Sequence, residues 1–435
     1  MRKLFFLYIV CLALSVSCKK DNVEPIDDSG GGLTPVMARD SVYDIMKYWY
    51  YWEEVAPVVN KNNYSDPHAI LEGMRYKELD RWSFLADYEE FEEQMKGTFV
   101  GHGFRIGLDD DLKARIAMIY SGSPLYAEGV RRGWIVNKVN GVNIAPLLLS
   151  PDGSGYSNVI GPSEAGITNT FEFVKPDGTT ATISSTKKIF TINSVLLYDT
   201  LHLSNKVAGH LVFESFILPT EQELKTAFSF FKQNNIQDLI VDMRYNPGGY
   251  LNIAGQIASY IGGNVLAGKT FAKLEYNSMR QDRNYPYPFL STPYSLGLPR
   301  MVVITSRSTA SASEAVMNSL KPHMEVVSVG DTTNGKPTGM NGWTIEKKYW
   351  FWPVTFKIVN SSNEGDYFAG IAPDKIAPDD ITHDFDDRNE ACLSEAIAYL
   401  ETGVFKSAKS TTRLKKYPQF DEKPSWMNNT FVKDK

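Results

Sequence analysis

Two segments of this 435-residue chain carry side chains that together could form a nucleophile and its base. The first is residues 306–314, a run of serine, threonine and alanine between a predicted buried strand and a predicted helix. The second is residues 332–337, a turn that follows a predicted strand and contains Lys336. A serine hydroxyl needs a base to become a nucleophile. A lysine can be that base once burial lowers its pKa from about 10.4 toward neutrality.

Neither segment identifies a catalytic site by itself. Serine and threonine are common at helix N-termini, where their oxygens accept hydrogen bonds from free backbone N–H groups, and Glu314 suits the positive end of a helix. A lysine in a turn is usually a solvated charge. Composition alone therefore favours an ordinary helix start for the first segment and a surface turn for the second.

A third segment changes this interpretation. Residues 242–249 read Asp-Met-Arg-Tyr-Asn-Pro-Gly-Gly at the end of a predicted buried strand. With the serine run and Lys336 following in order, the chain resembles the carboxyl-terminal processing (tail-specific) serine peptidases, whose strand-end motif is Asp-Leu-Arg-x-Asn-x-Gly-Gly. The resemblance extends over residues 40–405. It implies that Ser311 is the nucleophile and Lys336 its base. It also implies that the oxyanion is held by backbone N–H groups of Ala312 and of Gly248 or Gly249.

The chain departs from the family pattern in three places. Pro337-Thr338-Gly339 follows Lys336 where Gly-x-Val-Gln is common, and a long insertion separates Gly249 from Ser311. Some members have an acidic residue shortly after the serine helix, where this chain has Lys321-Pro322. The identity of any third catalytic residue therefore stays open, with Glu314 the best candidate. A carboxylate paired with the lysine ammonium would keep it charged, so Glu314 should not contact Lys336 Nζ.

The remaining sequence indicates the scaffold that positions these residues. Residues 39–96 have helical periodicity, residues 97–188 contain short strands and turn signals, and helices alternate with strands in residues 189–405. Thr220 and Glu223 have the spacing of a capping box at the start of one helix, and Tyr88–Met95 reads as an acidic helix. We expect an α/β multidomain fold with an N-terminal helical domain, a β-rich PDZ-like domain and an α/β peptidase core around a mostly parallel sheet.

The PDZ assignment depends on two stretches. Residues 123–141 resemble the centre of bacterial PDZ domains, with Ser-Pro, a short helix, a glycine turn, a strand and an Asn-Gly hairpin. Upstream, Gly101, His102, Gly103 and Phe104 lie where such domains have a loop whose N–H groups hold a peptide's terminal carboxylate. Most histidines in such loops bind no ligand, and this is the more common interpretation of His102. The resemblance implies polypeptide substrates with free C-termini.

The first residues indicate export. Arg2 and Lys3 precede the apolar stretch Leu4–Val16, which is shorter than the roughly 20 residues that span a bilayer, so residues 1–17 read as a signal peptide. Small residues before Cys18 resemble the lipidation box of bacterial lipoproteins, and residues 18–38 form a Gly-rich tether. We expect a protein of the bacterial cell envelope, facing periplasm or cell surface, that reaches the membrane only through the Cys18 lipid. Plain secretion is the alternative.

Composition excludes several other functions. The chain has 45 basic and 51 acidic residues and no basic stripe, which argues against nucleic-acid binding. Its three cysteines, Cys11, Cys18 and Cys392, cannot form a disulfide framework or a thiolate zinc site. No motif for a nucleotide or a metal occurs, so we expect no cofactor and no metal ion. Residues 406–435 form a polar C-terminal tail of unassigned role.

Two functions remain. The first is an exported lipoprotein serine endopeptidase that uses a Ser311–Lys336 dyad and recognises C-terminal tails through its PDZ domain. The alternative is a non-catalytic peptide-binding lipoprotein on the same fold. Retention of both dyad residues favours the enzyme.

Overall fold

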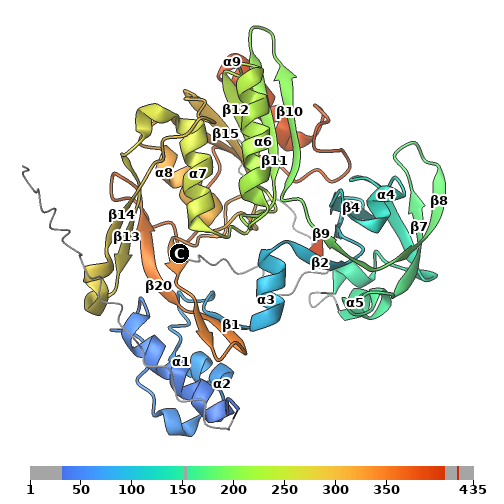
Figure 1. The fold of residues 1–435 in the computed structure, drawn as a ribbon. Helices are drawn as coiled ribbons and strands as arrows, with labels where there is room; N and C mark the ends of the chain where they lie inside the picture. The colour runs from blue at the N-terminus through green and yellow to red at the C-terminus, as the bar shows by residue number, and fades with distance from the viewer. Residues whose placement is uncertain (1–31, 151–153, 407–418, 421–435) are drawn as a thin grey trace, which may run out of the picture.

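The computed structural model describes residues 32–150, 154–406 and 419–420 (Figure 1). Residues 32–97 contain helices α1 (Pro35–Trp49), α2 (Pro67–Met74) and α3 (Tyr88–Met95), the 3₁₀ helix η1 (Lys61–Asn63) and strand β1 (Phe84–Asp87). Helices α1 and α2 begin alike. Thr34 and Asp66 accept hydrogen bonds from N–H groups of the first turn, and a proline takes the first helical position, where no N–H is needed.

The N-terminal helices share their core with the rest of the chain. Strand β1 pairs antiparallel with β19 (Tyr349–Trp352), which pairs with β18 (Trp343–Ile345). The rings of Phe91 in α3 and Trp352 in β19 lie 5.3 Å apart between centroids. Buried side chains of α1, α2 and α3 therefore belong to the same hydrophobic cluster as those of the α/β part.

A second sheet forms what we call the β domain, residues 97–191. Its strand order is β22-β3-β4-β5-β7-β8, and helix α5 packs on it with a hydrophobic cluster separate from the main core. The elements are β2 (Thr98–Gly101), β3 (Phe104–Leu108), β4 (Ala114–Ile119), α4 (Pro124–Ala127), β5 (Ile135–Val139), β6 (Val142–Asn143), η2 (Leu147–Leu149), α5 (Ser154–Ile160), β7 (Thr168–Val174), β8 (Thr180–Thr186) and β9 (Lys188–Thr191). Strand β22 (Gln419–Phe420) comes from the C-terminal segment.

The core of the chain surrounds a six-stranded sheet in the order β10-β11-β12-β15-β16-β21. All neighbours from β11 to β21 are parallel, and β10 is antiparallel to β11. The strands are β10 (Val195–His202), β11 (Val207–Phe213), β12 (Asp238–Asp242), β15 (Arg300–Thr305), β16 (Glu325–Gly330) and β21 (Lys375–Ile376). The helices are α6 (Thr220–Gln233), α7 (Leu251–Gly262), α8 (Ala312–Leu320) and α9 (Ala391–Thr402).

Both faces of this sheet are covered. Leu239 and Val241 of β12 face the hydrophobic cluster that includes α6, α7 and α8, whereas Ile240 faces the cluster that includes α9. Burial on two sides explains the uninterrupted apolar run in this strand. The functional groups of β12 consequently lie beyond its end, in the turn after Asp242.

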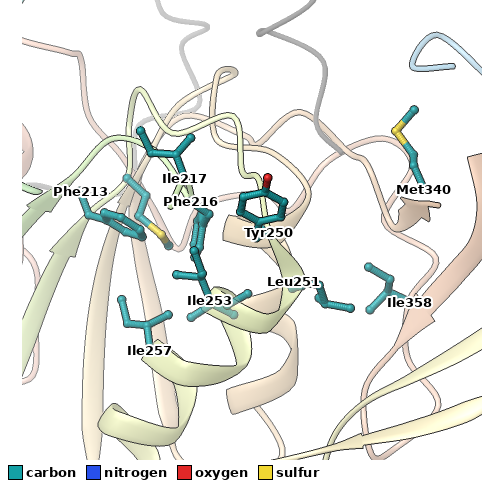
Figure 2. Packing of buried hydrophobic residues seen from close by; sticks show 14 of the residues in the cluster. Phe213, Phe216, Ile217, Tyr250, Leu251, Ile253, Ile257, Met340 and Ile358 are labelled. Atoms are coloured by element: carbon teal, nitrogen blue, oxygen red, sulfur yellow. The ribbon is translucent and has the colours of Figure 1, made fainter. Parts of the chain in front are cut away.

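An antiparallel sheet in the order β14-β13-β20-β17 completes the core. Its strands are β13 (Thr270–Tyr276), β14 (Tyr285–Pro288), β17 (Thr338–Met340) and β20 (Val354–Val359), and the 3₁₀ helices η3 (Asn264–Leu266) and η4 (Ser278–Arg283) flank β13. Figure 2 shows Met340 of β17 and Ile358 of β20 in the same apolar cluster as Leu251 of α7. Strand β17 thus carries the chain from the Lys336 turn directly into the core.

These observations confirm the α/β multidomain architecture with a helical N-terminal region, and helix α3 has the predicted bounds. Two expectations were wrong. Residues 39–96 also contain β1, whose partner lies far along the chain. Thr220 lies inside α6 rather than at its cap, because its Oγ1 bonds to Ser215 O and to Ile217 N–H.

No helix within the described ranges combines the length and the apolar character needed to cross a membrane. The predicted signal peptide (1–17), Cys18, residues 18–31 of the predicted tether and most of the tail lie outside the described residues. The tether was predicted to extend to residue 38, but residues 35–38 form the first turn of α1.

The end of β16 gives a prediction about stability. Gly330 has φ +124°, and a Cβ there would lie 2.1 Å from Thr305 O. We expect Gly330→Ala to lower the free energy of unfolding by about 3 kcal/mol or more, from backbone strain and overpacking together. The control is Gly178→Ala, which also has positive φ but open space around it; it should cost only about 1–2 kcal/mol. Urea denaturation measures both, and equal losses would contradict the crowding at Thr305.

Candidate active site

The candidate site lies where the central parallel strands end. The turns after β12, β15 and β16 contain residues 243–249, 306–311 and 331–336, the three segments singled out in the sequence. Carboxyl ends of parallel strands are the usual location of ligand sites in open α/β sheets. The fold therefore brings the three segments to one edge of the sheet.

Ser311 occupies a strained turn immediately before α8. Its backbone has φ 50° and ψ −106°, outside the conformations that residues other than glycine normally adopt. Its side chain is 1% exposed, and within the described chain its Oγ has no hydrogen-bond partner. Strain of this kind persists only where the surroundings impose it, and it is concentrated at functional sites.

Glu314 connects the serine to the lysine segment. Its Oε2 accepts hydrogen bonds from the backbone N–H groups of Ser311 and Lys336, both at 2.8 Å. Its Oε1 accepts from Gly335 N–H at 2.7 Å and from the Thr333 hydroxyl. Since one oxygen bonds both nitrogens, the backbones of Ser311 and Lys336 cannot lie farther apart than twice that bond length. Burial raises the pKa of Glu314, and the four hydrogen bonds oppose the rise.

Lys336 is completely buried in mostly apolar surroundings. Its Nζ lies 3.0 Å from Met340 Sδ and 5.8 Å from the centroid of the Trp82 ring. Burial holds the pKa of Lys336 well below its usual value, although the charges of Asp80 and Glu314 act in the opposite direction. A lysine with a lowered pKa can accept a proton near neutral pH.

Backbone donors for an oxyanion lie beside Ser311. Asn246 O accepts hydrogen bonds from Ala310 N–H and Ser313 Oγ, both at 3.1 Å, which holds the turn of residues 246–249 against the start of α8. Among the described residues, no hydrogen bond is formed by the N–H groups of Ala312 or Gly249. Gly248 N–H, in contrast, donates to Asn246 Oδ1 at 2.8 Å. Of the two glycines, Gly249 thus has the available donor.

The glycine at position 249 is required by its surroundings. It has φ +137°, and a Cβ there would lie 2.2 Å from Phe216 O. Its neighbours Gly248 and Tyr250 bond Phe216 through O and N–H respectively, which leaves the Gly249 N–H pointing the other way.

Sequence analysis missed the contribution of the N-terminal region. Arg81 donates to Asn334 O at 2.6 Å, so residues 80–82 lie against the turn that carries Lys336. Asp80 is buried and accepts hydrogen bonds from Tyr50, Ser83 and the backbone of residues 82–83. No local signal connects these residues with Lys336, because the contact joins distant parts of the chain. Met340 was also missed, as a methionine in a strand reads simply as core.

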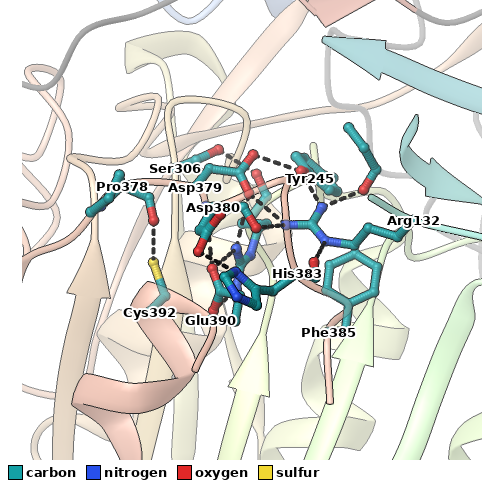
Figure 3. Close-up of polar contacts among 12 residues, drawn as sticks. Arg132, Tyr245, Ser306, Pro378, Asp379, Asp380, His383, Phe385, Glu390 and Cys392 are labelled. Atoms are coloured by element: carbon teal, nitrogen blue, oxygen red, sulfur yellow. Dashed lines mark hydrogen bonds and ion pairs between the residues drawn. The ribbon is translucent and has the colours of Figure 1, made fainter. Parts of the chain in front are cut away.

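A buried charge network supports the turn after β12 (Figure 3). Arg244 bonds three carboxylates, those of Asp242, Asp379 and Glu390, and is 1% exposed. Two arginines hold the pKa of Asp379 far below its usual value despite burial. Glu390 also caps α9, so the network fixes the motif arginine between β12 and that helix.

The proposed carboxylate loop lies apart from these residues, in the β domain. Gly101 ends β2, Phe104 begins β3, and His102 and Gly103 join them. The His102 ring is buried, with Nδ1 3.0 Å from Ser185 Oγ and Nε2 2.8 Å from Asn169 Oδ1. These two contacts give His102 a structural role, in line with the interpretation that it binds no ligand.

The lowered pKa of Lys336 predicts a pH-dependent stability. Between its folded-state pKa and about 10.4, the unfolded chain binds the extra proton, so stability should rise with pH across that window. Lys336→Met should unfold at higher urea concentration than the wild type at pH 7, and the difference should shrink by pH 10. The exposed Lys188, changed to Met, should show no such trend. A constant difference for Lys336→Met would contradict the lowered pKa.

Comparisons with known proteins agree with these features. A model of peptidase family S41 matches residues 208–377, and a model of the peptidase S41 N-terminal domain matches residues 37–84. A protein named as a CtpA-like serine protease of Staphylococcus aureus is 25% identical over 300 residues, which are 68% of this chain and 55% of that protein. The carboxy-terminal processing protease CtpB of Bacillus subtilis is 24% identical over 278 residues, which are 62% of this chain and 54% of that protein.

The chain thus spans about half the length of the curated relatives it matches. A crystal structure from Bacteroides fragilis, assigned to the S41 proteases, has a TM-score of 0.67 and 20% identity, covering 83% of this chain and 96% of that one. At this identity the likeness shows a shared fold. The two family models, one on the N-terminal helices and one on the core that carries Ser311 and Lys336, establish that the chain belongs to peptidase family S41.

Proposed function

We propose that this protein is a serine endopeptidase that cleaves polypeptides with a Ser311–Lys336 dyad. The proposal is carried by the buried Ser311 hydroxyl, which has no hydrogen-bond partner among the described residues and lies on a strained turn. One carboxylate, that of Glu314, joins this turn to the segment of Lys336, a buried lysine whose pKa is lowered.

Each residue has a distinct role in the proposed reaction. Neutral Lys336 Nζ takes the proton of Ser311 Oγ as that oxygen attacks the peptide carbonyl carbon. The N–H groups of Ala312 and Gly249 stabilise the negative oxygen of the tetrahedral intermediate, each typically worth about 3 kcal/mol. Protonated Lys336 then gives its proton to the leaving amine, and the acyl group stays on Ser311. Water, deprotonated by the same lysine, releases the acyl group and restores the serine.

One observation favours the non-catalytic alternative. Lys336 Nζ contacts Met340 Sδ, and no hydrogen bond joins it to Ser311 Oγ. Catalytic hydrogen bonds are often long before substrate binds and shorten in the complex. The dyad requires Lys336 Nζ to leave the weak thioether acceptor and turn toward Ser311 Oγ.

The β domain is proposed to hold the C-terminal tails of substrates in the manner of PDZ domains. Strand β3 follows directly on the glycine-containing loop of residues 101–104, and helix α5 packs beside the sheet. An extended peptide could add to the edge of β3 with its carboxylate toward the loop. Polypeptides with free C-termini are therefore the proposed substrates.

A location in the bacterial cell envelope, with a membrane anchor through lipid on Cys18, is likewise proposed. The support is the charge and apolar pattern of the first residues together with the Gly-rich tether. Exported polypeptides would then be the substrates that the site meets.

Substitutions in the dyad test the enzymatic proposal. Ser311→Ala, Lys336→Ala and Lys336→Arg should each reduce cleavage of an unfolded polypeptide such as reduced casein by at least about 1,000-fold. The double alanine variant should be scarcely worse than either single one, because the two groups act as a unit. Arginine fails because a guanidinium stays protonated near neutral pH.

The matched control is Ser308→Ala, in the same loop but exposed, which should keep wild-type activity. Activity of the wild type should fall as the pH drops through the lowered lysine pKa, since only the neutral amine accepts a proton. Wild-type rates in any of the three dyad variants would overturn the dyad assignment, whereas no cleavage by the wild type itself would support the non-catalytic alternative.

Cys18→Ser tests the anchor. The variant should leave the membrane fraction for the soluble fraction of cells while keeping its cleavage rate, since the tether lies outside the peptidase core. Fractionation followed by immunoblotting and mass spectrometry of the mature N-terminus measure the change. Wild-type protein with an unmodified N-terminus would rule out lipidation.

A further inference from the structure

A short piece of the C-terminal segment pairs with the β domain. Strand β22, Gln419–Phe420, lies antiparallel to β3, with Gln419 opposite Gly107 and Phe420 opposite Ile106. In the strand order β22-β3-β4-β5-β7-β8, β22 is the outermost strand, so β3 would be the edge of the sheet without it. The chain thus supplies its own extra strand at this edge.

The direction of β22 is that of a peptide ligand. Passing from Gln419 to Phe420 moves along β3 from Gly107 to Ile106, toward Phe104 and the loop of residues 101–104. A substrate that presents its C-terminus to that loop would run the same way. The segment therefore occupies the course that the proposed function gives to substrate.

The side chains of β22 are held on both sides. The ring of Phe420 packs against the hydrophobic cluster of the β domain, 6.2 Å from the ring of Tyr156 in α5. Gln419 Nε2 donates a hydrogen bond to Asp379 Oδ2 at 3.0 Å. Asp379 belongs to the charge network shown in Figure 3. The segment is thus held between β3 and α5 by an aromatic anchor and is tied to the core by one hydrogen bond.

Space remains for a longer chain. A cavity of about 670 Å³ lies between the β domain and the core, lined by Leu108 at the end of β3, by Asp379 and by Gln419. A polypeptide that continued beyond the β3 edge would enter this cavity. The groove is therefore reachable by an external chain once the segment leaves.

We propose that the groove between β3 and α5 binds an extended peptide with an aromatic side chain, and that residues 419–420 fill it as a tethered internal ligand that competes with substrate. The proposal rests on the proposed function insofar as the competing ligand is a substrate tail. A tethered segment acts at an effective concentration in the millimolar range, so the groove is occupied even when the contact is weak. The apparent affinity for an external peptide is then the intrinsic affinity multiplied by the fraction of molecules whose groove is free.

The test is a binding experiment that needs no proteolysis. The probe is a fluorescein-labelled hexapeptide with the sequence of residues 415–420, Lys-Lys-Tyr-Pro-Gln-Phe, with a free C-terminal carboxylate. It is titrated with the full chain in a Ser311→Ala background and followed by fluorescence anisotropy. Phe420→Ala, which removes the internal anchor, should bind the probe about tenfold more tightly.

The matched control is Tyr285→Ala, which removes an exposed aromatic side chain on β14, outside the β domain. It should leave the probe affinity unchanged. An equal affinity of the parent chain and Phe420→Ala would overturn the proposal, and so would the absence of probe binding in every form.

A reversible lock gives the converse result. Gly107→Cys with Gln419→Cys places two thiols at directly opposed positions, within the Cα separation that disulfides span, in a chain whose Cys11 and Cys18 are serine. Oxidation should weaken probe binding at least tenfold, and reduction should restore it. Failure of the disulfide to form, or equal binding in both redox states, contradicts the placement of the segment. If the protein were not a peptidase, only the Ser311-dependent cleavage assay would fail, and these binding results would stand.

Discussion

The geometry of the site depends on one buried carboxylate. Ser311 and Lys336 are separated along the chain by helix α8 and strand β16, and Glu314 joins their backbones by hydrogen bonds to both N–H groups. A buried carboxylate is costly unless it is hydrogen-bonded, and its four donors offset that cost. Every one of these donors is a backbone N–H or a hydroxyl, so Glu314 fixes the position of the lysine segment without forming an ion pair with the ammonium.

The rest of the fold serves this arrangement through burial. Lys336 has a lowered pKa because it is buried among two distant parts of the chain, Trp82 of the N-terminal region and the start of α8, and its near neighbour Met340 in β17. Trp82 keeps its place beside Lys336 because the N-terminal region is not an independently moving domain. Pairing of β1 with β19 and the shared hydrophobic cluster hold them on the core. The apparently separate helical region is thus part of the wall of the site.

The sequence predicted what local patterns determine. Alternating helices and strands indicated an α/β core, and the linked motifs located Ser311, Lys336 and the turn after β12. Patterns could not show contacts between distant segments, which is why β1 and Trp82 were missed. Met340, four residues after Lys336, was missed because a methionine in a strand reads simply as core. Gly248 and Gly249 could not be distinguished either, because the difference lies in which N–H group Asn246 Oδ1 engages. The capping-box spacing of Thr220 and Glu223 was misleading for the same reason, because the distant Ser194 hydroxyl contacts both side chains.

Asp379 shows how the β domain, the core and the C-terminal segment are held together. It bonds Arg132 of the β domain, Arg244 and Tyr245 of the core, and Gln419 of β22. Pulling the β domain away would strip Arg132, which is 4% exposed, of its carboxylate, and breaking a buried ion pair costs about 3–5 kcal/mol. Loss of Gln419 removes one neutral donor and leaves Asp379 with three other donors. The lost hydrogen bond to the charged carboxylate is worth about 1.5–3 kcal/mol of stability. Among the partners of Asp379, the C-terminal segment therefore has the weakest bond. Exposure of the β3 edge should proceed by release of this segment while the β domain stays on the core.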